Sequence, residues 1–458
     1  MSNSLLDQRF GWRWLLPPVT GNGVGLYGFS SEEETFWEED LARVRTSGGV
    51  EPVGLLLVDG DRCTLRESPS SAELHAAQVA GVVVGRERAH YWRAILAMEF
   101  PVVREYGLLP AANPRVVVPL DSPRHALAAL SLHRPGRWAA RVALWLAGQL
   151  ATLGSVAVLR ERVLFVAARD SDCRPRGLVE AGLRERCLTA GMMYALYLGT
   201  ADENRKTVIL PLGDASPEVI LKVAANSRSV ASLEHEAAVL ACLVESPVSE
   251  YVPRLAGVLA ASATLTVCQE YRPRCRIGER RMRKEVTVFL ARLSSINRRQ
   301  VLLADALAQL PASFDHGPAD ELVGACRALY ARLITLGGNG VQLWLHRAHG
   351  DFTPWNSAWT EKGLFVFDWE QSRSEDLALG DAFSYVVAPA RLLRQGASPR
   401  ATLSAALDLG DRVLAAAALS GPGSRVYMAL WLLHRAYQAA FFGELIVFLE
   451  RNWSCIHE

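Results

Sequence analysis

The sequence predicts an α+β protein in two parts, an α/β segment over residues 1–175 and a larger mixed part over residues 176–458. The boundary is placed at RDSDCRPRG, Arg169 to Gly177, which is polar and carries a proline and a glycine. On both sides of it, short apolar runs typical of strands alternate with segments of helical period. At about 150 residues per domain, the length also predicts more than one domain.

Composition excludes several classes of function. Forty-nine basic and forty-eight acidic residues leave a net charge of +1, so no overall field attracts nucleic acid or an anionic membrane, and we expect neither partner. The eight cysteines contain no C-x-x-C pair, and no signal segment opens the chain. This pattern predicts reduced thiols in the cytoplasm, without zinc or a disulfide framework.

In the first part, Gly54 to Asp59 (GLLLVD) and Gly81 to Gly85 (GVVVG) have the composition of short buried strands. The glycines at 23, 25 and 28 have G-x-G-x-x-G spacing, which is compatible with a nucleotide-binding loop or a plain glycine-rich turn. Two prolines precede these glycines, and the next helix is expected only from Ser31, with Glu34 completing a capping box. Both features favour the turn.

The uncharged stretch Val142 to Leu159 is almost as long as a membrane span, but polar residues interrupt it. We expect a buried helix that breaks near Gly154 and is followed by a strand over Val156 to Leu159.

The most informative motif is HGDFTPWN, His349 to Asn356, followed by LFVFDWE, Leu364 to Glu370. The intervening TEKG has turn composition, which predicts a hairpin of 357–359 with 364–368. Pairing Trp359 with Leu364 would set Asn356 opposite Phe367, next to Asp368. Because Mg²⁺ takes one or two hard oxygen ligands from the protein, Asn356 and Asp368 are predicted to hold the Mg²⁺ of a nucleotide.

Asp351 stands five residues before Asn356. In kinases, this D-x-x-x-x-N spacing places an aspartate to receive the proton of a substrate hydroxyl and an asparagine on magnesium. Asp351 is therefore the predicted catalytic base.

A kinase site also needs a cation for the nucleotide phosphates. In the expected strand Glu218 to Ala224, three aliphatic residues share one face and leave Lys222 on the other. A helix is expected from Ser229 or Ser232, and its apolar stripe (Leu233, Ala237, Leu240, Leu243, Val244) includes Glu236 but not Glu234. Since a buried carboxylate needs a partner, we predict that Glu236 supports Lys222.

The chain is predicted to run beside the adenine between Gln269 and Tyr271, so these two residues are the predicted adenine contacts. The reason is that the chain leaves an apolar strand there and enters a basic run, Arg272 to Lys284. That run is compatible with a solvated face or with contact to a phosphorylated or acidic substrate.

Together, Lys222, Glu236, HGDFTPWN and FDWE resemble the aminoglycoside phosphotransferase and choline kinase superfamily, whose fold resembles that of protein kinases. The resemblance implies a small lobe over about 185–270 and a helical lobe over about 271–458. It implies ATP and Mg²⁺ as cofactors and a small hydroxylated molecule as phosphoryl acceptor. It also implies a structural role for His349 and, for Asp381, support of the catalytic loop, although Asp381 is equally compatible with a helix cap.

Departures from the protein kinases narrow this prediction. No glycine-rich loop precedes Lys222, HGD stands where protein kinases have HRD, and DWE stands where they have DFG. The sequence thus predicts an ATP-dependent phosphotransferase that acts on a small molecule. A non-catalytic nucleotide-binding regulator and a protein kinase remain as alternatives.

Overall fold

The computed structural model shows an α+β protein that divides into two compact units. Unit 1 comprises Met1–Glu234 and Leu255–Arg272, and unit 2 comprises His235–Arg254 and Pro273–Glu458. The structure describes residues 9–17, 23–41, 44–46, 54–64, 68–111, 113–132, 138–153, 155–170, 192–199, 204–215, 217–224, 226–261, 264–275, 279–310, 321–393, 398–436, 438 and 440–453.

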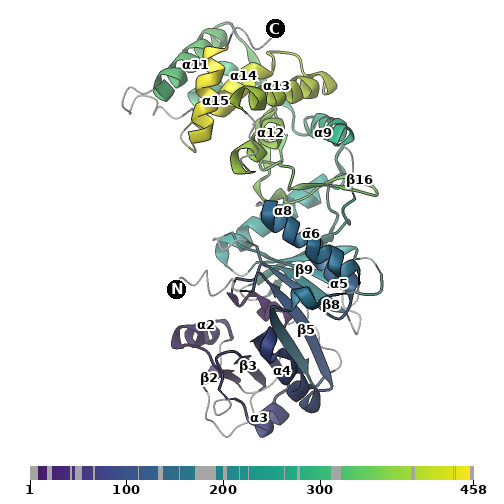
Figure 1. The fold of residues 1–458 in the computed structure, drawn as a ribbon. Helices are drawn as coiled ribbons and strands as arrows, with labels where there is room; N and C mark the ends of the chain where they lie inside the picture. The colour runs from purple at the N-terminus through teal and green to yellow at the C-terminus, as the bar shows by residue number, and fades with distance from the viewer. Residues whose placement is uncertain are drawn as a thin grey trace. The chain divides into compact units, whose positions relative to one another are not determined.

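Unit 1 is organised around a twelve-stranded sheet of order β11-β12-β10-β9-β8-β6-β5-β7-β4-β3-β1-β2 (Figure 1). Its strands are β1 (Val24–Tyr27), β2 (Val44–Thr46), β3 (Leu55–Asp59), β4 (Val79–Gly85), β5 (Val102–Leu109), β6 (Val116–Pro119), β7 (Arg162–Ala168), β8 (Met193–Tyr197), β9 (Thr207–Leu212), β10 (Val219–Ala224), β11 (Leu255–Ala261) and β12 (Thr264–Glu270). Its helices are η1 (Gly11–Leu15), α2 (Ser31–Leu41), α3 (Ser71–Ala76), α4 (Arg86–Glu99), α5 (Pro123–Ser131), α6 (Trp138–Thr152), η2 (Ala157–Leu159) and the start of α8 (Ser227–Leu243).

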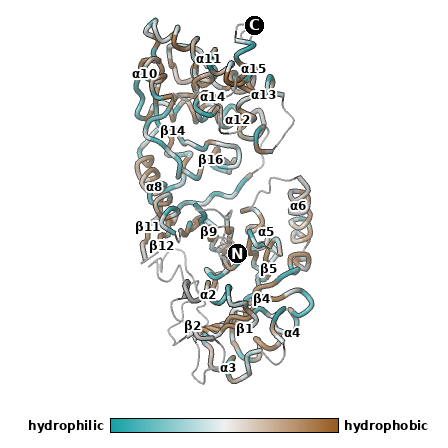
Figure 2. The backbone as a smooth tube through the Cα atoms, turned by 90° about the vertical axis from the view of Figure 1, so that its left-hand side faces the viewer, coloured by the Kyte–Doolittle hydropathy of each residue, from teal (hydrophilic) through white to brown (hydrophobic). Residues whose placement is uncertain are grey.

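Strands β2, β1, β3 and β4 form a parallel group. The strands expected at GLLLVD and GVVVG are confirmed as β3 and β4; both are mainly apolar, and the strands at the labels β1 and β4 are largely brown in Figure 2. Such runs suit strands that are covered on both faces. Separate buried clusters lie against this sheet, one including Trp12 and Trp37 and the other including Trp92 and Phe165.

The remaining strands of the sheet are antiparallel, and β6 pairs with β8 through Val116 with Tyr197 and Val117 with Leu196. The predicted division at about residue 175 falls within 171–191, outside the described residues. One sheet and one buried cluster nevertheless include strands from both sides of that division. Helix α5 also packs on both β6 and β8. In the described part of the chain, the first segment and the small-lobe strands share a core.

The expectation of a buried helix followed by a strand over 142–159 is wrong in two respects. Four apolar side chains of α6 are between 40% and 53% exposed: Val142, Trp145, Leu146 and Leu150. Residues 157–159 form the 3-10 helix η2 in place of a strand. The reason is that α6 has apolar residues around most of its circumference, whereas it packs mainly against α5 and η2. None of the described helices is long and apolar enough to cross a membrane.

The glycine motif spans β1, from Gly23 just before the strand to Gly28 in the short loop that leads to α2. Gly25 is inside the strand, whereas Gly28 follows it with a φ of +77°. A Cβ atom on Gly28 would lie 2.8 Å from the carbonyl oxygen of Asp59, so only glycine fits there. Helix α2 begins at Ser31 as expected, but Ser30 and Glu33 form the capping box one residue early.

Unit 2 contains a three-stranded sheet, β13-β14-β17, a separate hairpin, β15-β16, and a group of helices in which α11, α13, α14 and α15 pack together (Figure 1). Its elements after α8 are α9 (Glu279–Leu293), β13 (Arg299–Leu302), α10 (Leu303–Ala308), α11 (Glu321–Gly337), β14 (Gln342–Ala348), β15 (Ser357–Thr360), β16 (Gly363–Val366), η4 (Trp369–Gln371), β17 (Arg373–Leu377), α12 (Gly380–Leu393), α13 (Pro399–Ala416), α14 (Ser424–Leu433) and α15 (Ala440–Arg451). Five cysteines among the described residues are free.

Candidate active site

The HGD loop follows β14 and is held by a carboxylate from α12. Asp381, in the first turn of α12, accepts hydrogen bonds from the backbone N–H of His349 at 2.7 Å and of Gly350 at 3.1 Å. Burial raises the pKa of Asp381 to about 7, while these two hydrogen bonds lower it. Of the two sequence interpretations of Asp381, the geometry favours the support of the catalytic loop over the helix cap.

Gly350 has to be glycine for two reasons. Its φ is +85°, a conformation that side chains with a Cβ rarely adopt. A Cβ atom here would also lie 2.0 Å from the carbonyl oxygen of Gln371, well inside van der Waals contact. The close approach of two backbones thus fixes where the loop turns.

His349 ties the HGD loop to the FDWE segment. Its Nδ1 accepts from the backbone N–H of Asp351 at 3.3 Å, and its Nε2 lies 3.1 Å from the carbonyl oxygen of Phe367. This pattern requires the tautomer in which Nε2 carries the proton. The ring is fully buried, 4.6 Å from that of Trp369, and therefore has a structural position.

The predicted hairpin and its register are confirmed. Trp359 pairs with Leu364, and the backbone N–H of Phe367 donates to the carbonyl of Asn356 at 3.0 Å. The second strand ends at Val366, two residues earlier than expected, because Asp368 adopts the left-handed conformation with φ +72° and ψ +59°. Such a conformation is uncommon outside glycine and is found preferentially at functional sites.

Asp351, Asn356 and Asp368 come together at the open end of this hairpin. The Asn356 amide nitrogen donates to the carbonyl of Asp351 at 2.9 Å and to its Oδ2 at 2.8 Å, which leaves the amide oxygen of Asn356 for another partner. Burial, together with the nearby carboxylate of Asp368, raises the pKa of Asp351 to about 6. Arg391 on α12, which the sequence did not single out, lowers that pKa. Two carboxylates whose charges repel each other would be stabilised by a cation.

The metal-ligand assignment of Asn356 and Asp368 stays a prediction, but the donor set fits it. Both groups offer the oxygen atoms that Mg²⁺ prefers, and Mg²⁺ takes its remaining ligands from water and phosphate. Among the described residues, no group of three or more His, Cys, Asp and Glu side chains could hold a metal by itself.

Lys222 lies on β10, where it pairs with Val208 of β9 and Val267 of β12. The strand that the sequence predicted is therefore observed. Lys222 is only 5% exposed, which is unusual for a lysine. Gln269 pairs with Ile220, which lies two residues before Lys222 on β10. The side chains of Gln269 and Lys222 therefore lie on the same face of the sheet.

Glu236 lies on α8 and is fully buried, whereas Glu234 is exposed, as the helical stripe predicted. The Oε1 atom of Glu236 accepts from the backbone N–H of Trp369 at 3.3 Å, so it holds the turn that follows Asp368. The helix begins two residues before Ser229 because the Asn226 side chain accepts from the Ser229 backbone N–H at 2.9 Å.

The predicted adenine contacts, Gln269 and Tyr271, differ in what they offer a ligand. Gln269 is fully buried, and neither side-chain amide atom has a hydrogen-bond partner among the described residues. The backbone N–H of Tyr271 donates to the carbonyl of Glu218 at 2.7 Å. Any contact of Tyr271 with a base would therefore come from its carbonyl or its side chain.

Two arginines of the basic run, Arg272 and Arg274, make different contacts in the structure. Arg272 pairs with Glu270 at 2.8 Å, whereas the guanidinium carbon of Arg274 lies 5.2 Å from the ring centre of Phe367, the residue before Asp368. The sequence marked the run but not this residue, because stacking on Phe367 depends on a contact across more than ninety positions. Arg276 and the side chains of Arg280, Arg281 and Arg283 lie outside the described residues.

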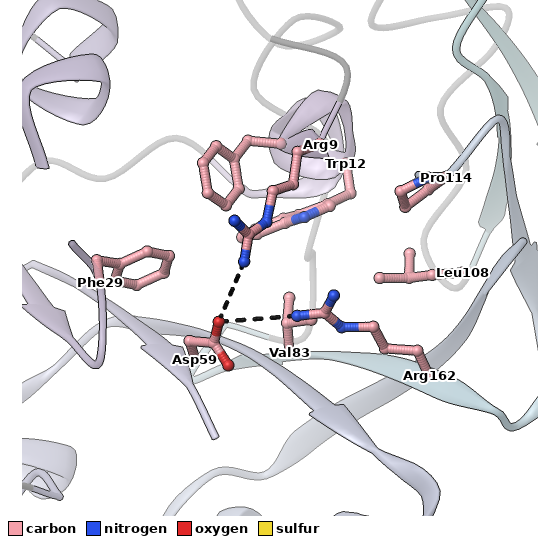
Figure 3. A pocket seen from close by; sticks show the side chains of 9 residues that line it. Arg9, Trp12, Phe29, Asp59, Val83, Leu108, Pro114 and Arg162 are labelled. Atoms are coloured by element: carbon pink, nitrogen blue, oxygen red, sulfur yellow. Dashed lines mark hydrogen bonds and ion pairs between the residues drawn. The ribbon is translucent and has the colours of Figure 1, made fainter. Parts of the chain in front are cut away.

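A second place deserves comparison, at the carboxyl ends of β1 and β3, where open parallel sheets commonly bind ligands. Arg9 and Arg162 converge there on Asp59, at 3.5 and 3.7 Å, as Figure 3 shows. The cavity has a volume of about 10 Å³, the space of roughly one water. Phe10 and Trp12 line it. This cavity has no room for a nucleotide, and the glycines at 23, 25 and 28 do not line it.

The chain is similar in structure to several small-molecule phosphotransferases. One is an aminoglycoside phosphotransferase from Streptomyces rimosus in complex with ADP and streptomycin; the match covers 52% of this chain and 92% of that one, at 14% identity and a TM-score of 0.32. A second is a thermostable mutant of an aminoglycoside phosphotransferase in complex with ADP and hygromycin B, covering 60% and 99%, at 13% identity and a TM-score of 0.39.

A third is a glucosamine kinase in complex with glucosamine, ADP and inorganic phosphate, covering 58% and 82%, at 17% identity and a TM-score of 0.31. At these identities and TM-scores, the likeness assigns neither a substrate nor a residue role to this chain. No protein-family model and no curated protein matches the sequence.

Proposed function

We propose that the protein is an ATP-dependent phosphotransferase that moves the γ-phosphoryl group to a hydroxyl of a small molecule. The supporting observation is the arrangement of Asp351, Asn356 and Asp368. A partly buried carboxylate, hydrogen-bonded by the asparagine five residues later, lies near enough to a second carboxylate for the two charges to interact. Phosphoryl transfer needs this combination, because its catalysis consists mainly of positioning and electrostatic stabilisation.

Asp351 is the proposed base. Asn356 donates to its Oδ2 atom, so Oδ1 is the oxygen that would accept the proton of the acceptor hydroxyl. A pKa of about 6 leaves the group ionised at neutral pH while keeping it a better proton acceptor than an exposed aspartate. The hydrogen bonds from the loop to Asp381 would hold this carboxylate in place.

Asn356, through its amide oxygen, and Asp368 would hold Mg²⁺, and a bound Mg²⁺-ATP would supply the transferable phosphoryl group. Lys222 is proposed to bind the nucleotide phosphates. Glu236 is proposed to support the site, and its hydrogen bond to the Trp369 N–H shows one way in which it can orient the turn at Asp368. Gln269 and Tyr271 are proposed to contact the base.

Arg274 favours an acceptor that is neutral or anionic. Its guanidinium lies over Phe367, beside the predicted metal ligand, where it would repel a polycationic acceptor. The acceptor panel should therefore include sugars, amino alcohols, nucleosides and antibiotics, in neutral and phosphorylated forms.

The test starts with thermal unfolding of the full chain with ATP and Mg²⁺, followed by turnover assays over that panel. Asp368→Ala should weaken ATP binding in the presence of Mg²⁺ more than in its absence, since a metal ligand is lost. Equal weakening under both conditions would reject that assignment. Binding of ATP without turnover on any acceptor would instead favour the non-catalytic regulator, and transfer to generic protein substrates would favour a protein kinase.

A further inference from the structure

Unit 1 contains a groove that no part of the proposed kinase site uses. It has a volume of about 530 Å³, within the usual range of roughly 300–1,000 Å³ for small-molecule sites. Its polar lining consists of Arg86, His90, Arg93, Glu105 and Arg160.

The groove is built from three elements of the same unit. One wall is α4, where Arg86, His90, Arg93 and Ala97 recur at helical spacing and so share a face. The floor is formed by β5 and β7, where Glu105 pairs with Phe165. On the β5 side the segment of η2 crosses the sheet at Gly107, because a Cβ atom on that glycine would lie 2.4 Å from the carbonyl oxygen of Leu159. This close crossing brings Arg160 to the groove.

The charges in the groove are not balanced. Three arginines face one glutamate, which gives a net charge of +2 with His90 neutral. Glu105 contacts the Nε atom of Arg160 at 3.0 Å and a terminal nitrogen of Arg93 at 3.7 Å, so it orients both guanidinium groups. The exposed side chain of Arg86 has no ion-pair partner within the described part of the chain.

We propose that this groove binds a small molecule that carries a phosphate group and an apolar body. A phosphate monoester at neutral pH has a charge between about −1.5 and −2, which matches the excess of the groove. Guanidinium groups bind phosphate oxygens through paired hydrogen bonds, and Arg86 and Arg93 provide them from positions two turns apart on one face of α4. The apolar body would lie against the alanines of α4 that line the same groove, Ala89, Ala94 and Ala97.

Calorimetric titration of the full chain with phenyl phosphate, without divalent metal, tests the proposal. Benzoate keeps the ring with a single charge, and inorganic phosphate keeps the charge without the ring. We expect saturable binding of phenyl phosphate, tighter than that of either comparison ligand. No saturation up to about 10 mM, or equal binding of benzoate, would overturn the proposal.

Variants place the binding in the groove. R86Q/R93Q should weaken the binding of phenyl phosphate by about tenfold or more, because two charged donors are lost. Arg93 is 63% exposed and Arg86 is also exposed, so the double variant should retain the thermal midpoint of the wild type. R400Q is the matched control, since Arg400 is an exposed arginine on α13, and it should bind as the wild type does. Binding by the folded double variant at wild-type affinity would refute the site.

Discussion

Two aspartates at the ends of strands, Asp59 after four buried residues of β3 and Asp351 after β14, invite direct comparison. Asp59 contacts three arginines, Arg9, Arg62 and Arg162, between 3.5 and 3.7 Å. Asp351 has instead an amide donor and a second carboxylate nearby. Burial raises the pKa of both carboxyl groups, but the arginines lower that of Asp59, whereas Asp368 raises that of Asp351 further.

The difference separates a structural cluster from a site that fits a ligand. Around Asp59 the chain supplies its own counter-charges, and the adjoining cavity holds roughly one water. Around Asp351 the chain places a second carboxylate, an arrangement that a cation would stabilise. A glycine lies next to each aspartate, since Gly28 approaches the Asp59 carbonyl and Gly350 precedes Asp351, so the sign of the neighbouring charges is what distinguishes the two regions.

The largest expected effect comes from removing the first region altogether. A fragment of residues 176–458 loses β6 as the partner of β8 and the cover of α5, which exposes a strand edge and part of a shared core. If the division into residues 1–175 and 176–458 that the sequence predicts were a domain boundary, this fragment would fold and bind ATP alone. The shared sheet leads us to expect instead that it lacks a cooperative thermal transition. Circular dichroism and ATP calorimetry beside the full chain decide between these expectations, and wild-type affinity in the fragment would restore the sequence-based division.

The second test exchanges one carboxylate oxygen for nitrogen in each region. Asp351→Asn should lower turnover by about 10²- to 10⁴-fold with nucleotide binding retained, because the proton acceptor is lost while its shape is kept. Asp59→Asn should leave turnover unchanged but reduce the free energy of unfolding by about 2 kcal/mol, since the partly buried guanidinium groups of Arg9 and Arg162 lose a counter-charge. Steady-state kinetics and denaturant unfolding of both variants measure the contrast. A catalytic loss in the Asp59 variant would break it.

The third test concerns the backbone of the HGD loop. Gly350→Ala should destabilise the protein by about 3 kcal/mol and abolish turnover, because the added methyl meets the Gln371 carbonyl. Gly363→Ala is the matched control: its φ is +107°, yet no atom lies within 4 Å of the added methyl, so we expect a loss of about 1 kcal/mol. Thermal unfolding distinguishes the two, and equal losses would show that the close approach to Gln371 is unimportant.

The smallest effect is a shift in the pH dependence. Asp351 accepts a proton only when ionised, and its pKa is raised from 3.8 to about 6. The value of kcat/KM should therefore be maximal above this pH and fall about tenfold for each pH unit below it. Asp59→Asn should leave this acidic limb where it is. Profiles of kcat/KM from pH 4 to 8 provide the measurement; a limb near pH 4 in the wild type would argue against Asp351 as the base.

Much of the candidate site could be predicted because its parts are local. The spacing of Asp351 and Asn356 and the register of Trp359 with Leu364 depend on one turn and on strand alternation. The burial of Glu236 depends on the period of a single helix. The left-handed conformation of Asp368, by contrast, ended the strand earlier than its apolar composition suggested.

The sequence by itself determined the chemical groups of the site, their order and the elements that carry them, because helical and strand periodicity act over a few residues. The tertiary structure alone decided that Asp381 supports the HGD loop, that β6 joins β8, and that Asp59 is neutralised by arginines. Each of these contacts joins residues that local periodicity does not relate. Which charges are compensated is a property of the folded chain, since compensation depends on distances that only packing sets.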